Sequence, residues 1–248
     1  GVPLQFDADA TRQIRGPKCS AVTLTVQTPG EAPRDIMLIR TSIQGNLNIV
    51  SQLVPTTDGS KIGYISIPTF FDETIPPQID DPLEACGPLD GLILDVRLNG
   101  GGSSSVVDPI FKLFVDGTLG KFVSRNDSRA LQVKADPIHN SQTVPIIVIV
   151  SEDTVSYGEI FAGVLKDLGR AKVVGQTSLG NVEVLHGYNF DDNSQVWIAS
   201  ETFYSATSET NFELSGIIPD VEAFAEWDTI TFETDPSIKA ALGLLGHQ

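Results

Sequence analysis

A serine stands at the start of a predicted helix. The run "VPIIVIVSEDTVSYGEIFAGVLKDLG" begins with a buried strand and continues, after a short loop, into a helix over 156–168, which places Ser156 in its first turn. Backbone N–H groups in a first turn have no partner within the helix, and they carry a positive partial charge. A nucleophilic hydroxyl there lies beside donors that can hold an oxyanion. The alternative is structural, because serine is also a preferred residue for capping a helix N-terminus.

A glycine-rich corner follows a second apolar strand. The strand "GLILDVRL" runs into "NGGG", Asn99 to Gly102. Consecutive glycines let the backbone approach a ligand closely and direct N–H groups towards it; the alternative is a flexible turn. Reactive groups in parallel sheets lie at the carboxyl ends of the strands. The two corners are therefore expected to form one site.

The elements around these corners predict a mostly parallel sheet. Apolar runs at 91–98, 144–151 and 171–176 are typical of strands covered on both faces. Between them we expect one helix that starts at Pro109 and another over 156–168. Strand, helix and strand in alternation indicate right-handed crossovers. We expect three further segments to extend this sheet, "VEVLHGYNF", "SQVWIASETFYS" and "GIIPDVEAF", with a hairpin-like turn at Asp192–Asn193, and a final helix in "DPSIKAALGLLG".

The first 43 residues form a separate segment. "DATRQIRG" has a helical pattern, and "SAVTLTVQTPG" and "RDIMLIRTSI" alternate like paired strands joined at Pro29-Gly30. This segment is too small to form a core by itself. The next stretch, residues 45–70, supplies strands around an Asp58-Gly59 turn.

Composition narrows the function classes. The chain has 248 residues and a net charge of −16, which disfavours nucleic-acid binding because phosphate affinity comes from clustered Lys and Arg. It has no run of 18 apolar residues and no signal peptide at its start, as expected of a mature or trimmed product. The histidines and cysteines show no metal-ligand spacing. We expect Cys19 and Cys86 to be free thiols, although one disulfide is possible.

Several motifs resemble the carboxyl-terminal processing proteases, also called tail-specific proteases. "GLILDVRLNGGG" is similar to their "D-L-R-x-N-x-G-G" segment, and "TVSYGEIFAGVLKDLGRAKVVGQTSLGN" is similar to their nucleophile helix and the strand after it. "GIIPDV" resembles their "G-I-x-P-D-V", and "GYISIPTF" their first core strand. Residues 12–43 resemble the second half of the family's PDZ domain. The resemblance covers nearly the whole chain in the family's order.

The resemblance implies specific roles for individual residues. Ser156 falls on the nucleophile, and the backbone N–H groups of Tyr157, Gly101 and Gly102 fall on the oxyanion hole. Asp167 and Arg170 fall on positions that we interpret as structural, holding the end of the helix and the following strand.

The family's general base is absent. Its lysine falls on Asn181 and its supporting glutamine on Leu185. An amide cannot accept a proton near neutral pH, and a serine without a base is a weak nucleophile. One alternative is a different base: on a strand, Glu183 would share a face with Asn181 beside Ser156, whereas His186 would point to the other face. Lys172 is expected to face solvent.

Two further alternatives stay open. The chain is either a proteolytically inactive relative that binds peptides or small apolar ligands, or a peptidase with a lineage-specific or engineered loss at position 181. The PDZ resemblance also begins after the loop and strand that would capture a peptide tail, so this segment is expected to be incomplete.

The sequence thus predicts an α/β fold, with a layered core of the crotonase-like or ClpP-like kind and a mostly parallel sheet. We expect a partial PDZ-like segment at 1–43 and a serine peptidase core at 44–248. The predicted function is a serine endopeptidase, with a catalytically impaired binding protein as the alternative. Protein or peptide substrates are expected, with no metal or organic cofactor and no nucleic acid. The resemblance alone implies an extracytoplasmic location.

Overall fold

The structure is a computed structural model that describes residues 14–28, 30–41, 48–192, 194–226 and 229–247. The chain divides into two compact units. The smaller unit comprises residues 1–45 and 226–230, and the larger comprises 46–225 and 231–248.

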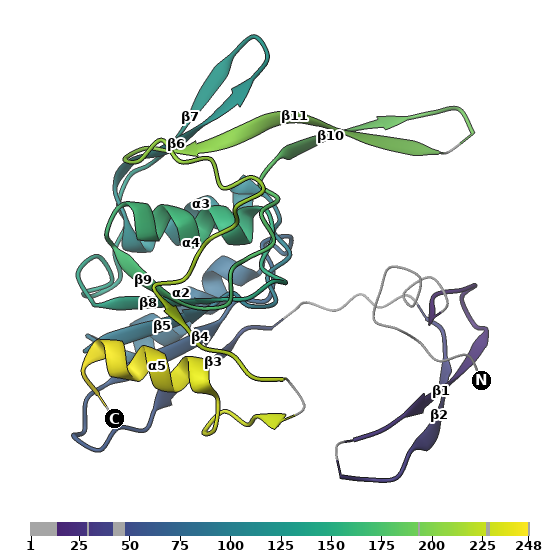
Figure 1. The fold of residues 1–248 in the computed structure, drawn as a ribbon, viewed down its shortest axis with the longest axis horizontal. Coiled ribbons are helices and arrows are strands. Elements are labelled where there is room, and N and C mark those ends of the chain that lie inside the picture. Colours follow the sequence, from purple (N-terminus) through teal and green to yellow (C-terminus); the bar gives the residue numbers. More distant parts are fainter. Residues whose placement is uncertain (1–13, 29, 42–47, 193, 227–228, 248) are drawn as a thin grey trace. The chain divides into compact units, whose positions relative to one another are not determined.

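A six-stranded sheet forms the centre of the larger unit. Its strand order is β12-β9-β8-β5-β4-β3 (Figure 1). The strands β4, β5, β8, β9 and β12 are mutually parallel, and β3 pairs antiparallel with β4. The bounds are β3 (Val50–Val54), β4 (Ile62–Ser66), β5 (Gly91–Asp95), β8 (Ile146–Val150), β9 (Ala171–Gly175) and β12 (Val221–Glu222). The α/β class and the mostly parallel sheet are therefore confirmed.

Helices cover both faces of this sheet. The helices α2 (Ile75–Cys86), α3 (Ser104–Phe114) and α4 (Tyr157–Asp167) lie on one face, and α5 (Pro236–Leu245) lies on the other (Figure 1). The core is divided in the same way, because alternate residues of β8 point to opposite clusters: Val148 packs with the first group of helices and Ile149 with α5. A strand buried on both faces must be apolar throughout, which is why these runs were predictable from the sequence.

A second, antiparallel sheet has the order β10-β11-β6-β7. Its strands are β6 (Gly117–Ser124), β7 (Ser128–Val133), β10 (Val184–Asn189) and β11 (Gln195–Ser205). We expected the segments of β10 and β11 to extend the parallel sheet, and this expectation was wrong; only β12 does so. The physical reason is pairing: β11 pairs antiparallel with β6, and β10 pairs with β11. Both β10 and the first half of β11 are largely exposed, unlike the strands of a sheet covered on both faces.

Two local predictions also need correction. The helix α3 starts at Ser104, and Pro109 lies inside it rather than at its beginning. Proline removes one backbone hydrogen bond there, but burial of a stripe of large side chains outweighs that loss. These are Val106, Val107, Ile110, Phe111, Leu113 and Phe114. The helix α2 and the hairpin of β6 and β7 were not predicted at all.

The smaller unit contains the predicted hairpin. The strands β1 (Ala21–Val26) and β2 (Arg34–Ile39) pair antiparallel, with Ala21 opposite Ile39. The helix predicted in "DATRQIRG" falls mainly outside the described residues. The likeness of this segment to part of a PDZ domain stays a prediction.

Candidate active site

Ser156 occupies a strained backbone conformation at the N-cap of α4. Its φ is 56° and its ψ is −122°, a conformation that residues with a side chain rarely adopt. Two hydrogen bonds from its N–H hold it in place, one to the Asn181 carbonyl oxygen at 2.9 Å and one to Glu159 Oε2 at 3.2 Å. Strain of this kind persists only where the surroundings enforce it, and it is concentrated at functional sites.

The glycine corner lies directly against this serine. A Cβ atom on Gly101 would lie 2.7 Å from Ser156 Cβ and 3.1 Å from Ser156 Oγ. Gly102 lies even closer to another backbone segment, because a Cβ atom on it would lie 1.9 Å from the carbonyl carbon of Phe70. The φ values are 96° for Gly101 and 155° for Gly102. Only glycine fits either position, so the two sequence corners do meet in space.

Asn99 joins the two corners from within. Its side chain is completely buried and donates to the Ile67 carbonyl oxygen at 3.0 Å. Its Oδ1 accepts from the Gly101 N–H at 2.9 Å, and its backbone oxygen accepts from the Val155 N–H at 2.9 Å. The loop before Ser156 and the loop after β5 are therefore one hydrogen-bonded structure.

These bonds determine which N–H groups remain for a ligand. Gly101 was predicted to supply an oxyanion donor, but its N–H is taken by Asn99, so its observed contribution is the absence of a side chain against Ser156. Among the described residues, the N–H groups of Gly102 and Tyr157 have no hydrogen-bond acceptor. Of the three predicted oxyanion donors, these two therefore have N–H groups that are not already used.

The side chain of Tyr157 is fixed by the second sheet. Its ring is buried and meets the Phe122 ring at a centroid distance of 6.0 Å. The Arg129 guanidinium stacks 3.9 Å from the Phe122 centroid and forms a bidentate ion pair with Glu201, with a shortest distance of 2.7 Å. Burial raises the pKa of Tyr157, while the positive charge of Arg129 opposes this shift. The antiparallel sheet thereby holds the side chain of Tyr157, the residue that follows Ser156.

Glu159 is a buried carboxylate that organises the base of the site. It is fully inaccessible to solvent and accepts from Ser178 Oγ at 2.6 Å, from the Gly180 N–H at 2.6 Å and from the Asn181 N–H at 2.8 Å, in addition to Ser156. This residue was not among the site residues predicted from the sequence. Its position three residues after Ser156 is the spacing of a capping box, a signal that could have identified it.

Position 181 lies beside Ser156, but the amide there provides no base. The backbone contacts described above bring Asn181 next to the serine, and its side chain is exposed. The strand β10 begins only at Val184 and shifts register before Leu185, so Asn181 and Glu183 do not share a strand face as the alternating pattern predicted. Glu183 is half-buried, and its catalytic role stays a proposal.

No side chain in the described part of the chain is hydrogen-bonded to Ser156 Oγ as a base would be. The ammonium of Lys166 binds the Ile218 carbonyl oxygen at 2.6 Å and Asp220 at 2.9 Å. Lys172 is exposed on β9, as expected, and His186 is exposed on β10. The serine corner is thus built without a Ser–Lys pair.

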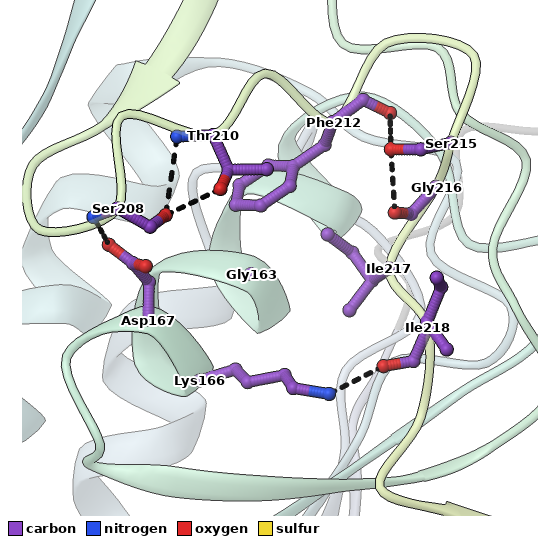
Figure 2. A pocket seen from close by; sticks show the side chains of 10 residues that line it. All are labelled: Gly163, Lys166, Asp167, Ser208, Thr210, Phe212, Ser215, Gly216, Ile217 and Ile218. Carbon is purple, nitrogen blue, oxygen red and sulfur yellow. Dashed lines mark hydrogen bonds between the residues drawn. The ribbon is translucent and has the colours of Figure 1, made fainter.

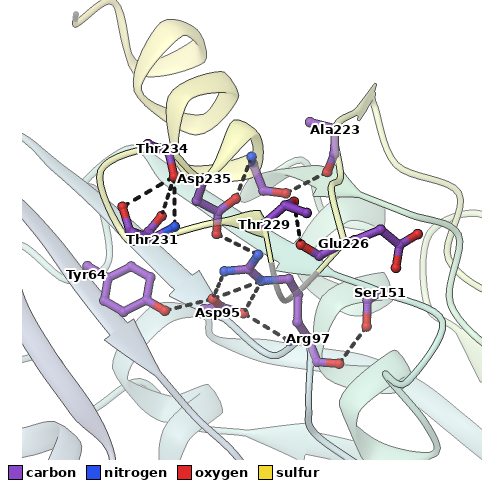
Figure 3. Close-up of polar contacts among 11 residues, drawn as sticks. Tyr64, Asp95, Arg97, Ser151, Ala223, Glu226, Thr229, Thr231, Thr234 and Asp235 are labelled. Atoms are coloured by element: carbon purple, nitrogen blue, oxygen red, sulfur yellow. Dashed lines mark hydrogen bonds and ion pairs between the residues drawn. The ribbon is translucent and has the colours of Figure 1, made fainter. Parts of the chain in front are cut away.

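A buried ionic cluster supports the strand that leads into the glycine corner. Arg97 lies two residues before Asn99, is 8 % exposed, and pairs with Asp95 at 2.6 Å and with Asp235 at 2.7 Å (Figure 3). The Tyr64 hydroxyl donates to Asp95 at 2.7 Å, and burial raises the pKa of Tyr64 well above its usual range. Ser151 Oγ donates to the Arg97 carbonyl oxygen at 2.7 Å. Asp235 caps α5, so this cluster ties the last helix to the site.

A separate cavity lies at the opposite end of α4. It measures about 410 Å³ and is lined by Gly163, Lys166 and Asp167 of the helix and by the chain from Ser208 to Ile218 (Figure 2). Phe212 and Ile217 supply its apolar wall, and neither Ser156 nor the glycine corner reaches it. This cavity is not the site of the predicted chemistry.

Three further observations concern ions, membranes and thiols. Within the described residues, no group of three or more His, Cys, Asp or Glu side chains is arranged to hold a metal ion. No helix in that part of the chain is long and apolar enough to cross a membrane. Cys19 and Cys86 are free thiols, as predicted.

A layered α/β core with a strained serine at a helix N-terminus and unpaired N–H groups beside it is the architecture of a serine-type peptidase. The chain belongs to Peptidase family S41, whose sequence profile matches residues 61–223. The resemblance to carboxyl-terminal processing proteases is therefore confirmed.

Named relatives agree with this assignment. The chain is 27% identical to a probable CtpA-like serine protease of Staphylococcus aureus (strain COL) over 260 residues, which cover 97% of this chain and 50% of that protein. It is 31% identical over 194 residues to the carboxy-terminal processing protease CtpB of Bacillus subtilis (strain 168), covering 75% of this chain and 39% of the relative. The chain spans about half the length of the curated relatives it matches.

Two solved structures show the same fold at low sequence identity. A photosystem II D1 C-terminal processing protease has a TM-score of 0.64 and 23% identity, covering 86% of this chain and 58% of that one. A putative S41 protease from Bacteroides fragilis has a TM-score of 0.71 and 15% identity, covering 91% and 65%.

Proposed function

We propose that this chain carries the proteolytic site of a serine endopeptidase of the carboxyl-terminal processing kind, with Ser156 as its nucleophile. The observation that carries the proposal is the close contact between Ser156 and Gly101, which brings the glycine corner against the serine. The N–H groups of Gly102 and Tyr157, the residues that follow them, have no acceptor among the described residues, which supports their role as oxyanion donors. The substrate is a polypeptide, and its scissile carbonyl oxygen points between these two donors.

The proposed reaction proceeds by acyl transfer. Ser156 Oγ attacks the carbonyl carbon, and the N–H groups of Gly102 and Tyr157 stabilise the negative charge that develops on the oxygen. In other serine peptidases, removing one such donor raises the barrier by about 3 kcal/mol. The hydroxyl proton goes to water or to Glu183, whose carboxylate follows Asn181 by two residues. When the peptide C–N bond breaks, the leaving amine takes a proton from the same group, and a water molecule then hydrolyses the acyl–serine ester and restores the hydroxyl. Base assistance typically contributes about 10²–10⁴-fold, so we expect slow turnover.

Covalent labelling tests the nucleophile. Incubation with a fluorophosphonate probe over hours should label the parent chain and leave Ser156→Ala unlabelled, and peptide mapping should place the adduct on Ser156. A parent chain that labels no faster than Ser156→Ala would refute the proposal. Cleavage of an unfolded protein substrate, with Glu183→Gln as a second variant, tests the base: loss of cleavage in both variants supports Glu183.

A non-catalytic binding protein is the second candidate function. It is favoured by Asn181 at the position of the family base and by the absence, among the described residues, of any base hydrogen-bonded to Ser156 Oγ. Such a protein would bind unfolded polypeptide with equal affinity as parent and as Ser156→Ala, and neither form would cleave it.

We also propose an extracytoplasmic location, on the family resemblance alone. Fractionation of the source cells, followed by detection with an antibody against this chain, tests it; recovery in the cytosolic fraction would contradict it.

A further inference from the structure

The outer part of the second sheet is a two-stranded arm. The arm comprises Val184–Asn189 of β10 and Gln195–Ala199 of β11, and it extends away from the helices of the larger unit (Figure 1). Large apolar side chains on the arm are 40–60 % exposed, although soluble proteins rarely leave such groups gathered at the surface. They are Leu185, Tyr188, Val196, Trp197 and Ile198.

One face of the arm carries packing and hydrogen-bond contacts within the arm, although its side chains stay largely exposed. Trp197 lies across Gly187, with its ring atoms 2.9 Å from where a Cβ of that glycine would be. On the same face, Gln195 Nε2 donates to Asn189 Oδ1 at 2.6 Å. Aromatic packing over a strand glycine stabilises a ribbon of this kind. The arm therefore has internal support for its folded form and does not require a permanent partner.

The other face is open. The strand register places His186 opposite Ile198 and Tyr188 opposite Val196, so these four side chains share that face. His186 contacts the Tyr188 ring at a centroid distance of 4.8 Å. Tyr188, Val196 and Ile198 on this face are 40–53 % exposed, so the face presents large apolar side chains to solvent.

Beyond the register shift between Val184 and Leu185, the edge of the arm is unprotected. β10 is the terminal strand of its sheet, so one side of its backbone has no strand partner among the described residues. Natural edge strands usually carry Lys, Pro or inward-pointing charges that prevent another strand from pairing with them. The sequence of β10, "VLHGYN", contains no lysine, proline or acidic residue. An unprotected edge with apolar side chains is the arrangement that binds extended peptides by strand addition.

The arm is continuous with the candidate active site. β10 starts three residues after Asn181, whose carbonyl oxygen accepts from the Ser156 N–H. β11 continues from the arm to Glu201, which holds Arg129 against the Phe122 and Tyr157 rings. Six strand residues span roughly 20 Å. One end of a polypeptide paired with β10 would therefore lie near the loop of Asn181, which contacts Ser156.

Charge decides between two occupants. The end of the arm carries Asp191 and Asp192, and the whole chain has a net charge of −16. Pairing two copies through their arms would bring together two chains that each carry this net charge, whereas an unfolded chain of neutral or basic character would meet no such repulsion.

We propose that the arm binds unfolded polypeptide of neutral or basic character, which adds as a strand along β10 and places its apolar side chains on the open face. This inference rests on the proposed function in so far as the bound polypeptide is the substrate. It predicts a binding surface outside the catalytic corner that acts only on chains long enough to reach it.

Binding can be measured without catalysis. The probe is fluorescein-labelled lysozyme that has been reduced and carboxamidomethylated, and binding to the Ser156→Ala chain is followed by fluorescence anisotropy. Salt of about 0.3 M screens the net charges. Tyr188→Ser/Ile198→Ser should weaken binding by about tenfold or more, corresponding to about 1.4 kcal/mol. The matched control is Val50→Ser/Leu53→Ser on β3, which also removes two exposed apolar side chains from an edge strand and should leave binding unchanged.

The outcomes separate this inference from the proposed function. Equal binding by the arm variant and the control would overturn the inference, as would a parent dimer in analytical ultracentrifugation that the arm variant abolishes. If the double variant unfolds, Val196→Thr on the same face replaces it. Where the parent cleaves, the arm variant should lower kcat/KM on the unfolded protein and not on a tetrapeptide substrate. Where the parent does not cleave, arm-dependent binding still supports the inference although the proposed function has failed.

Discussion

At the scale of single residues, the candidate site depends on close approach rather than on charge. Ser156 is held at a positive φ, and Gly101 approaches it so closely that no side chain fits between them. The hydroxyl and the free N–H groups therefore lie in a fixed geometry before any ligand arrives. Preorganised donors of this kind are effective because they need no rearrangement during the reaction.

Gly101→Ala should slow the reaction of Ser156, whereas the same change at Gly100 should not. The new methyl group would lie 2.7 Å from Ser156 Cβ, so the serine must move. A displacement of about 1 Å can cost about 100-fold in rate, and we expect fluorophosphonate labelling to slow by at least that factor. Gly100→Ala is the matched control, because nothing lies within 4 Å of its Cβ position. Equal labelling rates in the two variants, both shown to be folded by circular dichroism, would contradict this interpretation.

Asn181→Lys should increase the reactivity of Ser156. The backbone of position 181 is hydrogen-bonded to that of Ser156, so a lysine there starts beside the serine. A general base contributes about 10²–10⁴-fold, and a gain of at least tenfold in labelling or cleavage is expected. The methionine of Asn181→Met is nearly as long as lysine but has no amine, so this variant should gain no reactivity at Ser156. A lysine variant no faster than the methionine variant would show that another group supplies the base.

At the scale of elements, the two ends of α4 have different structural roles. The N-terminus presents Ser156 and places Glu159 beneath it, whereas the C-terminus fastens the helix to its surroundings. Asp167 Oδ2 accepts from the N–H groups of Thr207 and Ser208, at 3.0 and 3.2 Å. Just after the helix, the Arg170 guanidinium donates to the carbonyl oxygens of Phe114, Ser141 and Val144. These contacts match the structural roles expected for Asp167 and Arg170.

Asp167→Asn should destabilise the protein at neutral pH and much less in acid. Partial burial raises the pKa of Asp167, but the hydrogen bonds from Ser208 and Thr207 outweigh it and lower the pKa below its usual value. A lowered carboxyl pKa means that the stabilisation is complete above the unfolded value, near 4, and is lost as pH falls through the folded value. Because the side chain is partly exposed, we expect only about 1 kcal/mol at pH 7.

Thermal unfolding of the two proteins between pH 3 and pH 7 measures this effect. The difference in Tm should be largest from pH 6 to 7, at roughly 2–4 °C, and should shrink below pH 4. A difference that stayed constant with pH would mean that the carboxylate charge has no part in the contact.

At the scale of the whole molecule, the last helix and the central sheet are joined through buried charge. Arg97, two residues after β5, pairs with Asp95 at the end of that strand and with Asp235 at the start of α5. Burial alone lowers the pKa of Arg97, but the two carboxylates outweigh this and raise it. Asp235 also accepts from the Ser237 N–H at 2.8 Å, so a single side chain caps the helix and neutralises the buried cation.

Asp235→Ala should be strongly destabilising. It leaves the guanidinium of Arg97 short of one partner and removes the cap of α5, and breaking a buried pair typically costs about 3–5 kcal/mol. The control is Asp58→Asn, which weakens the pair between the half-exposed Asp58 and His247 at 2.9 Å and should change the urea midpoint much less. Similar midpoints for the two variants would show that the buried cluster contributes little. Ser156 labelling should also slow in Asp235→Ala below its unfolding midpoint, because β5 leads into the glycine corner.

The sequence by itself determined the central strands, the helix that begins at Ser156, the glycine corner and the missing lysine at position 181. Each of these is a local signal: a strand covered on both faces must be apolar throughout, and a helix start has its own residue preferences. The carboxyl ends of parallel strands meet by topology, so the meeting of Ser156 with the glycine corner could also be expected.

Only the tertiary structure decided which sheet each strand joins and which polar groups are used. β6 contains two glycines and has weak strand propensity, yet Gly120 is required because the Phe203 ring would lie 2.3 Å from its Cβ position. Three polar arrangements could not be predicted from the sequence either. They are the hydrogen bond from the Gly101 N–H to Asn99, the four donors to Glu159, and the ion pair of Arg97 with Asp235. Asp235 is far from Arg97 along the chain, and the distance between such groups is fixed only when the packed core brings their elements together.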